Sequence, residues 1–136
     1  MSKPVTPEQI ALAGDEHSQQ AAFFCWSALP EVRRAYPCLE FMFAIPNGGA
    51  RDGRTGARLK AEGVKPGVPD VCLPYRNRQT GYAGLWIEFK VGDNTLTTEQ
   101  RNFREYLEYA GYKIVICYTW KDAADAVIAY IKGERN

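Results

Sequence analysis

The spacing of hydrophobic residues divides the chain into helical and extended stretches. In the longer helical stretches apolar residues recur every three or four positions, which is the period of one helix face. Two stretches begin with the pattern of a capping box, Thr6 with Gln9 and Thr97 with Gln100. The predicted helices cover residues 6–13, 15–29, 57–63, 97–110 and 122–133. In the fourth helix, the residues expected to face the core are Phe103, Tyr106, Leu107 and Ala110.

Four other stretches have the composition of strands. Residues 38–46 are rich in Phe, residues 71–74 and 85–91 flank a polar hairpin-like stretch, and residues 112–118 are almost all apolar. A strand that is apolar on both faces is typical of the middle of a sheet, so the last stretch predicts a central strand. The order is helix, three strands with one short inserted helix, then helix, strand, helix. It predicts an α/β fold with a mixed sheet covered by helices on both faces.

Length and composition agree with a soluble globular protein. The 136 residues are 46% hydrophobic and 24% charged, which fits a single domain over residues 1–136 with an N-terminal extension at 1–14. No apolar run approaches the ~20 residues of a membrane span, and residues 1–10 lack the features of a signal peptide. We therefore expect a cytoplasmic protein with no membrane partner, in the host cytoplasm if a phage encodes it.

The cysteines and the single histidine exclude several kinds of catalytic centre. Cys25, Cys38, Cys72 and Cys117 form no CxxC pair, so the spacing of a zinc or redox site is absent. With His17 as the only histidine, neither a histidine-based triad nor a multi-histidine nuclease motif is expected. Any chemistry must therefore depend on carboxylates, Lys, Arg and amides.

Charged residues interrupt the strand at 85–91. Side chains alternate along a strand, so Trp86, Glu88 and Lys90 point to the same side. A buried charge is unfavourable unless it is paired or holds a metal. Taken alone, the pattern is also explained by an ordinary half-exposed strand that carries a Glu and a Lys.

Asp70 favours a catalytic interpretation of these charges. It begins the neighbouring strand, directly after Pro69, and pairing of the two strands would place a second carboxylate beside Glu88. Adjacent carboxylates repel each other unless a cation lies between them, and hard oxygen ligands suit Mg²⁺ or Mn²⁺. Lys90 could then orient a metal-activated water for attack on phosphorus. Together the three charged residues indicate phosphodiester hydrolysis.

The same residues match a known motif. Pro69-Asp70, seventeen intervening residues and Glu88-Phe89-Lys90 resemble the PD-(D/E)xK nuclease motif. The flanking sequence resembles the VRR-NUC family, the virus-type replication-repair nucleases of that superfamily, and the resemblance implies a restriction-endonuclease-like core. The stretches that carry it are, in order, EHSQQ, FAIPNGG, RLKAEGVKPGVPDVCLP, GLWIEFK and LTTEQRNFREYLEYAGYKIVI, from about Glu16 to Tyr130.

The resemblance implies a role for each residue of the motif. Asp70, Glu88 and the backbone carbonyl of Phe89 would hold the metal, Mg²⁺ or Mn²⁺. Lys90 would place the attacking water. These four residues form the predicted centre of the catalytic site.

Two further catalytic residues are implied from outside the strands. Glu16 would add a carboxylate to the metal site, directly or through water, although Asp15 beside it is the competing alignment. A surface acid at a helix N-terminus is the alternative explanation for Glu16. Gln100 would lie beside the site, although its spacing from Thr97 also fits a helix cap, and one residue can do both.

A basic segment surrounds the Gly-rich stretch at 47–56. The formal net charge of +1 gives no overall sign of a nucleic-acid-binding protein, and a solvated basic surface would account for the segment. Because the resemblance implies a nuclease, we expect backbone N–H groups and basic side chains here to contact phosphates. The predicted DNA contacts are Asn47, Arg51, Arg54, Arg58, Lys60 and Lys65.

The stand-alone members of the family resemble phage proteins that form homodimers and resolve four-way junctions. The resemblance therefore implies a metal-dependent endodeoxyribonuclease that acts as a homodimer on Holliday junctions. A general endonuclease, or one that cuts flaps and nicked duplex, is the alternative among enzymes. A non-catalytic DNA-binding module is the alternative outside them, and it would have no need for Asp70, Glu88 and Lys90.

Overall fold

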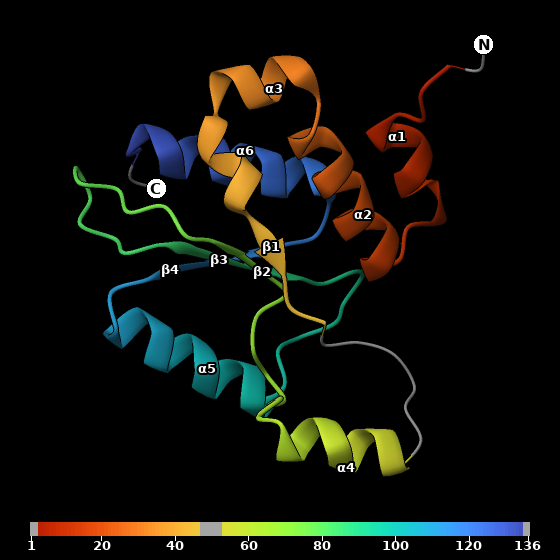
Figure 1. Ribbon diagram of the computed structural model, residues 1–136, viewed down its shortest axis with the longest axis vertical. Helices are drawn as coiled ribbons and strands as arrows, with labels where there is room; N and C mark the ends of the chain where they lie inside the picture. Colours follow the sequence, from red (N-terminus) through yellow and green to blue (C-terminus); the bar gives the residue numbers. More distant parts are fainter. Residues whose placement is uncertain (1–2, 47–52, 135–136) are drawn as a thin grey trace.

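A mixed four-stranded sheet with helices on both faces forms the centre of the computed structural model, which describes residues 3–46 and 53–134 (Figure 1). The strands lie in the order β1 (Phe43–Ala44), β2 (Val71–Leu73), β3 (Leu85–Phe89) and β4 (Lys113–Cys117). β2 is antiparallel to both β1 and β3, whereas β4 runs parallel to β3. The fold class predicted from the sequence is confirmed.

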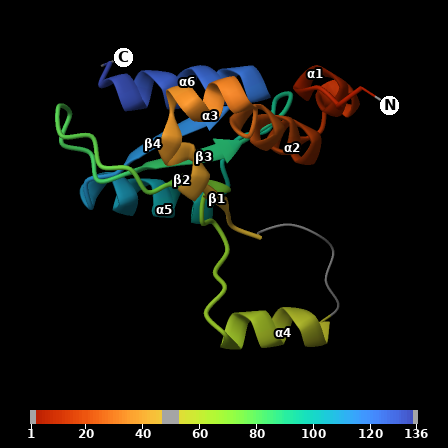
Figure 2. The same cartoon turned by 45° about the horizontal axis from the view of Figure 1, so that its top comes forward.

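The helices divide between the two faces of the sheet. α2 (Glu16–Ser27), α3 (Pro30–Ala35) and α6 (Trp120–Lys132) lie on one face, and α5 (Thr98–Tyr109), which connects the parallel strands β3 and β4, lies on the other (Figure 1). α4 (Gly53–Ala61) projects away from the sheet (Figure 2). The short helices are α1 (Pro7–Ile10), η1 (Ala11–Ala13) and η2 (Pro37–Phe41). In the described part of the chain, no helix has the length and apolar character needed to cross a membrane.

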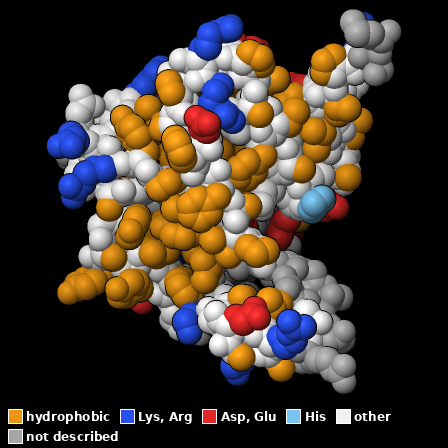
Figure 3. Space-filling model, in the orientation of Figure 1, with side chains coloured by type: hydrophobic (Ala, Val, Ile, Leu, Met, Phe, Trp, Pro, Cys, Tyr) orange, Lys and Arg blue, Asp and Glu red, His pale blue; other side chains and the backbone are white. Residues whose placement is uncertain are grey.

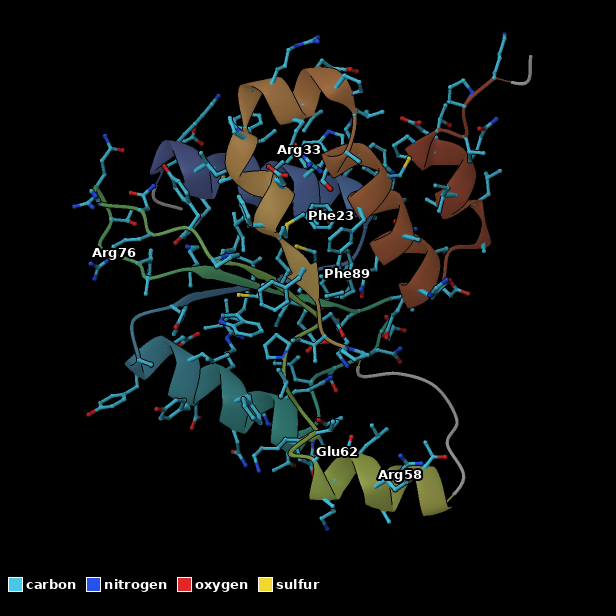
Figure 4. All side chains as sticks on the ribbon, viewed as in Figure 1. Phe23, Arg33, Arg58, Glu62, Arg76 and Phe89 are labelled. Carbon is cyan, nitrogen blue, oxygen red and sulfur yellow. The ribbon has the colours of Figure 1, made fainter. Side chains whose placement is uncertain are left out.

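The hydrophobic core holds the side chains on one face of β3 and thereby sets the direction of the side chains on its other face. Leu85, Ile87 and Phe89 are almost completely buried against the α2 and α6 side. Phe23 of α2 contacts Phe89, with ring centroids 5.8 Å apart (Figure 4). Burial of each such side chain contributes about 2 kcal/mol to stability. Because alternate residues of a strand face opposite ways, this packing sets the direction of the intervening residue Glu88.

Two predicted elements have different boundaries in the structure. The strand expected at 38–46 is largely the 3₁₀ helix η2, and only Phe43 and Ala44 pair with β2. Pro37 at the first helical position has the φ angle that starts such a turn, which the Phe-rich composition did not reveal. The helix expected at 57–63 begins earlier, at Gly53, so part of the predicted loop is helical.

Two predictions of burial were also wrong. β4 is at an edge of the sheet rather than in its middle; its sequence is apolar because α5 and α6 both pack against it. In α5, Leu107 is buried, but Tyr106 is 64% exposed and Ala110 is exposed as well. The helix lies over the β4 edge of the sheet, so a narrower stripe of the helix is covered than the sequence pattern indicated.

Candidate active site

The pairing of β2 with β3 brings the two predicted carboxylates together. Val71 lies opposite Ile87 in the antiparallel register, so the preceding residue Asp70 comes beside Glu88. The Asp70 side chain is hydrogen bonded to that of Glu88, and its Oδ2 accepts a hydrogen bond of 2.7 Å from the backbone N–H of Phe89. Asp70 therefore lies within reach of both predicted ligands on β3.

The backbone around Asp70 is held from two sides. Its carbonyl accepts a hydrogen bond of 2.7 Å from the N–H of Ile45, just after β1. Three residues earlier, Gly67 has a φ of +89°, and a Cβ atom there would lie 2.5 Å from the carbonyl carbon of Glu99. Only glycine fits such a close approach at this φ. The segment that leads to Asp70 is thus pressed against the first turn of α5.

Glu88 is a buried carboxyl group in an acidic environment. Its side chain is only 4% exposed. Burial raises the pKa of Glu88 to about 9, and the hydrogen bond and charge of Asp70 and the charge of Glu16 add to this effect, whereas Lys90 opposes it. A proton shared between two carboxylates occupies the position that a cation would take. The electrostatics of the site therefore favour a bound cation.

Lys90 is held beside this pair by the sheet. It is 8% exposed, and its backbone N–H donates a hydrogen bond of 3.0 Å to the carbonyl of Cys117, which continues the pairing of β3 with β4. By strand alternation its side chain leaves the chain on the same side as that of Glu88. The site therefore combines two carboxylates with one ammonium group.

The start of α2 separates the roles of its two acidic residues. Asp15 is the N-cap, because its Oδ1 accepts a hydrogen bond of 2.7 Å from the N–H of Ser18, and hydrogen bonds from Ser18 lower its pKa. Glu16 lines a cavity of ≈750 Å³ together with Asp70 and Glu88. Asp15 and Glu16 are the two residues that could align with the family's acidic position, and Glu16 is the one that lines the cavity with Asp70 and Glu88.

The same cavity, called here the carboxylate cavity, includes two side chains that were not predicted. His17 and Gln20 line it, and Figure 3 shows acidic side chains and the histidine beside the hollow above α4. Gln20 is one helical turn after Glu16, so the i, i+4 spacing could have indicated it. Its neighbour Gln19 instead accepts a hydrogen bond of 2.8 Å from the N–H of Trp120, which joins α2 to α6.

Gln100 caps α5 and also borders the carboxylate cavity. Its Oε1 accepts a hydrogen bond of 2.9 Å from the N–H of Thr97, and its own N–H donates one of 3.1 Å to the Thr97 hydroxyl. The predicted capping box is confirmed. Because the cap uses the amide oxygen, the amide NH₂ is the part of this side chain that can act toward a ligand in the cavity.

The donor set fits a hard divalent cation that keeps part of its water shell. Asp70, Glu88 and the carbonyl of Phe89 offer only oxygen atoms, which Mg²⁺ and Mn²⁺ prefer. Over residues 3–46 and 53–134, no three His, Cys, Asp or Glu side chains converge into a metal cluster. The protein would therefore supply two carboxylates and a carbonyl, with water filling the other positions.

The predicted DNA contacts are only partly described. Asn47 and Arg51 lie outside the described residues, as does the side chain of Arg54. Lys60 and Lys65 are exposed and line a second cavity of ≈790 Å³ between α4 and the start of α5. We call this second cavity the α4 cleft. Arg58 is exposed but does not line the cleft, and Figure 4 shows it on α4 near Glu62.

Comparisons with known proteins bear on the fold. No protein-family model matches the chain, and no curated protein matches it. Among solved structures, one described as "VRR_NUC domain protein" is similar with a TM-score of 0.70 and 26% sequence identity, over 87% of this chain and 88% of that chain. The family resemblance of the sequence motifs is thereby confirmed at the level of the whole fold.

The burial of Glu88 predicts a stability effect that depends on pH. Glu88 remains protonated in the folded metal-free protein up to about pH 9 but ionises near 4.5 when unfolded, so stability is lost as the pH rises between these values. We expect Glu88→Gln, which does not ionise, to raise the free energy of unfolding in EDTA by on the order of 2 kcal/mol at pH 8 and to change it little at pH 5.

Urea denaturation at both pH values measures this difference. Glu62→Gln, at an exposed position directly after α4, is the matched control and should behave like the wild type at both pH values. An equal effect of Glu88→Gln at pH 5 and pH 8 would show that Glu88 is not held protonated by its surroundings.

Proposed function

We propose that this chain, which has the motifs and the fold of the VRR-NUC nuclease family, is a metal-dependent endonuclease that hydrolyses phosphodiester bonds in DNA. The observation that carries the proposal is the contact of Asp70 with Glu88 at the wall of an open cavity. Lys90 does not line this cavity, but it is buried close enough for its charge to act on Glu88. Burying these groups together has a stability cost that ordinary packing would avoid. Such a stability cost is expected at a catalytic centre that acts on a negatively charged substrate.

The residues of the site divide the chemistry between them. Asp70, Glu88 and the carbonyl of Phe89 would hold Mg²⁺ or Mn²⁺, which neutralises charge on the phosphate and lowers the pKa of bound water. Glu88 would hold the cation as a carboxylate and would release its proton to solvent, because the cation would stabilise both carboxylates. Lys90 carries only donors, so it orients an attacking water through the oxygen lone pairs and stabilises negative charge that develops on the phosphate.

The remaining polar groups face the reacting centre from two helices. Glu16 from α2 would bind the metal, directly or through a water of its shell. Gln20 of α2 and Gln100 of α5 both line the carboxylate cavity, and their amide groups can hold the phosphate oxygens or ordered water. These contacts would align the scissile phosphate for in-line attack.

Basic residues next to the site support DNA as the substrate. Lys60 and Lys65 line the α4 cleft, which shares Asp70 and Gln100 with the carboxylate cavity. A nucleic-acid backbone that follows these lysines would therefore reach the carboxylates. The same proposal includes DNA contacts from four further residues: Asn47, Arg51, Arg54, and Arg58 on the outer side of α4.

We further propose that the enzyme acts as a homodimer on Holliday junctions. Two active sites related by a two-fold axis can cut symmetry-related strands of a junction. The surface that supports self-association is apolar: Figure 3 shows hydrophobic side chains gathered over η2, β1 and the end of α5. Phe41 is 69% and Tyr109 is 89% exposed, and β1 lies at the edge of the sheet. Exposed apolar patches beside an edge strand mark interaction surfaces.

DNA cleavage should depend on the metal and on Lys90. Wild-type protein with Mg²⁺ or Mn²⁺ should introduce paired nicks in an end-labelled four-way junction, and EDTA should stop it. Lys90→Ala should reduce the rate by about 10²-fold or more while junction binding is kept, because water placement is lost and phosphate contacts remain. Lys121→Ala, at an exposed position on α6, is the control and should cut like the wild type.

The DNA panel for this experiment includes a flap and a linear duplex. Equal cutting of all three substrates would support the general endonuclease and reject junction selectivity. Binding without any metal-dependent scission would support the non-catalytic DNA-binding module instead.

Formation of the homodimer should depend on the exposed apolar surface. The double variant Phe41→Asp, Tyr109→Asp should be a monomer in sedimentation velocity under conditions where the wild type is a dimer, because two charges would be buried in the apolar interface. Leu12→Asp, an equally exposed apolar position on η1, should remain dimeric. A monomeric wild type would reject the homodimer, and a dimeric double variant would place the interface elsewhere.

A further inference from the structure

The α4 cleft continues the carboxylate cavity. It lies between α4 and the first turn of α5 and has a volume of ≈790 Å³. Pro46, Asp70 and Gln100 line both spaces. A ligand in the cleft therefore runs directly to the two carboxylates, without crossing the outer surface of the protein.

The lining of the cleft combines apolar and basic side chains. Lys60 and Lys65 supply positive charge, and Glu99 and Asp70 supply negative charge, with Asp70 at the end shared with the carboxylate cavity. Four apolar side chains also line the cleft: Leu59, Val64, Pro66 and Val68. The outside of a paired duplex presents mainly phosphates and sugars, for which an apolar lining has no use. Unpaired nucleotides also present the faces of their bases, which proteins bind on apolar surfaces within a basic groove.

We propose that the α4 cleft binds an unpaired DNA strand and leads it to the carboxylates. This inference rests on the proposed nuclease function and narrows its substrate. In the proposed four-way junction, this strand would be nucleotides that come unpaired at the branch point, next to the scissile phosphate. The lysines hold the backbone of the strand, and the apolar side chains contact its bases.

Gly56 keeps the cleft open on the α4 side. It lies within the helix and lines the cleft, and a Cβ atom there would meet nothing within 4 Å. Its φ is not positive, so the backbone does not require glycine at this position. Glycine inside a helix costs about 1 kcal/mol relative to alanine. The missing side chain leaves room for a ligand to approach the helix closely.

The opposite wall of the cleft is fixed in place. Gly67 lines it and is pressed against the backbone of Glu99, as described above. The N-terminal turn of α5 is closed by the capping box of Thr97 with Gln100. Both contacts involve backbone atoms and a helix cap, so this wall of the cleft is rigid. A groove that binds a DNA strand needs such a wall to hold the strand in a fixed position relative to the active site.

A steric block in the cleft tests the proposal. Gly56→Leu places a large side chain in the cleft without a clash in the free protein and improves helix propensity. Ala57→Leu introduces the same side chain one residue later, at an exposed position that does not line the cleft. Circular dichroism and thermal melting would show that both variants keep the fold.

The measurement is fluorescence anisotropy of a labelled 12-nucleotide oligo-dT and of a labelled duplex, in EDTA. We expect Gly56→Leu to weaken oligo-dT binding at least about fivefold and duplex binding much less, while Ala57→Leu leaves both unchanged. With Mn²⁺, Gly56→Leu should also slow cutting of the four-way junction, whereas Ala57→Leu should leave it unchanged.

The outcomes separate this inference from the proposed function. Unchanged oligo-dT binding by Gly56→Leu would overturn the cleft proposal even if the wild type cuts DNA. Equal weakening of oligo-dT and duplex would make the cleft a general backbone groove and would also overturn it. If the wild type cuts no DNA with any metal but Gly56→Leu selectively loses oligo-dT, the strand-binding cleft stands and the nuclease function falls.

Discussion

The contact between Asp70 and Glu88 is the constraint on which the other features of the site depend. Two carboxylates are held together where one of them is almost completely buried. In the absence of a cation this arrangement keeps Glu88 protonated at neutral pH, at a cost to stability. The sheet register, the core beneath β3 and the β4 contact of Lys90 all fix the positions of these groups. The contact between the two carboxylates lowers the stability of the fold, but it keeps the site assembled before its ligands bind.

The fold supplies the surroundings of that contact from separate layers. α2 brings Glu16 and Gln20 from one face of the sheet, and α5 brings Gln100 from the other. α4 stands away from both layers and forms a second space that opens toward Asp70 (Figure 2). Because α4 stands away from the sheet, its surface can change with little effect on the packing that positions the carboxylates.

The centre of the site could be predicted from the sequence because it depends on local rules. Strand alternation places Glu88 and Lys90 on one side, and the hairpin connection at 74–84 pairs their strand with the one that follows Asp70. Features that depend on tertiary packing could not be predicted in this way. The apolar run of β4 indicated a central strand, but helices cover both faces of this edge strand, and that coverage alone makes its sequence apolar. The α4 cleft requires the packing of Gly67 against α5, which no local pattern indicates.

The most direct test of the account is isothermal titration of Mn²⁺ into the metal-free protein at pH 7, in two buffers with different ionisation enthalpies. The account predicts binding with release of about one proton, because the cation displaces the proton held by Glu88. Asp70→Asn should lose most of this affinity and of the proton release. Absence of binding by the wild type, or unchanged binding by Asp70→Asn, would show that the two carboxylates are not a metal site.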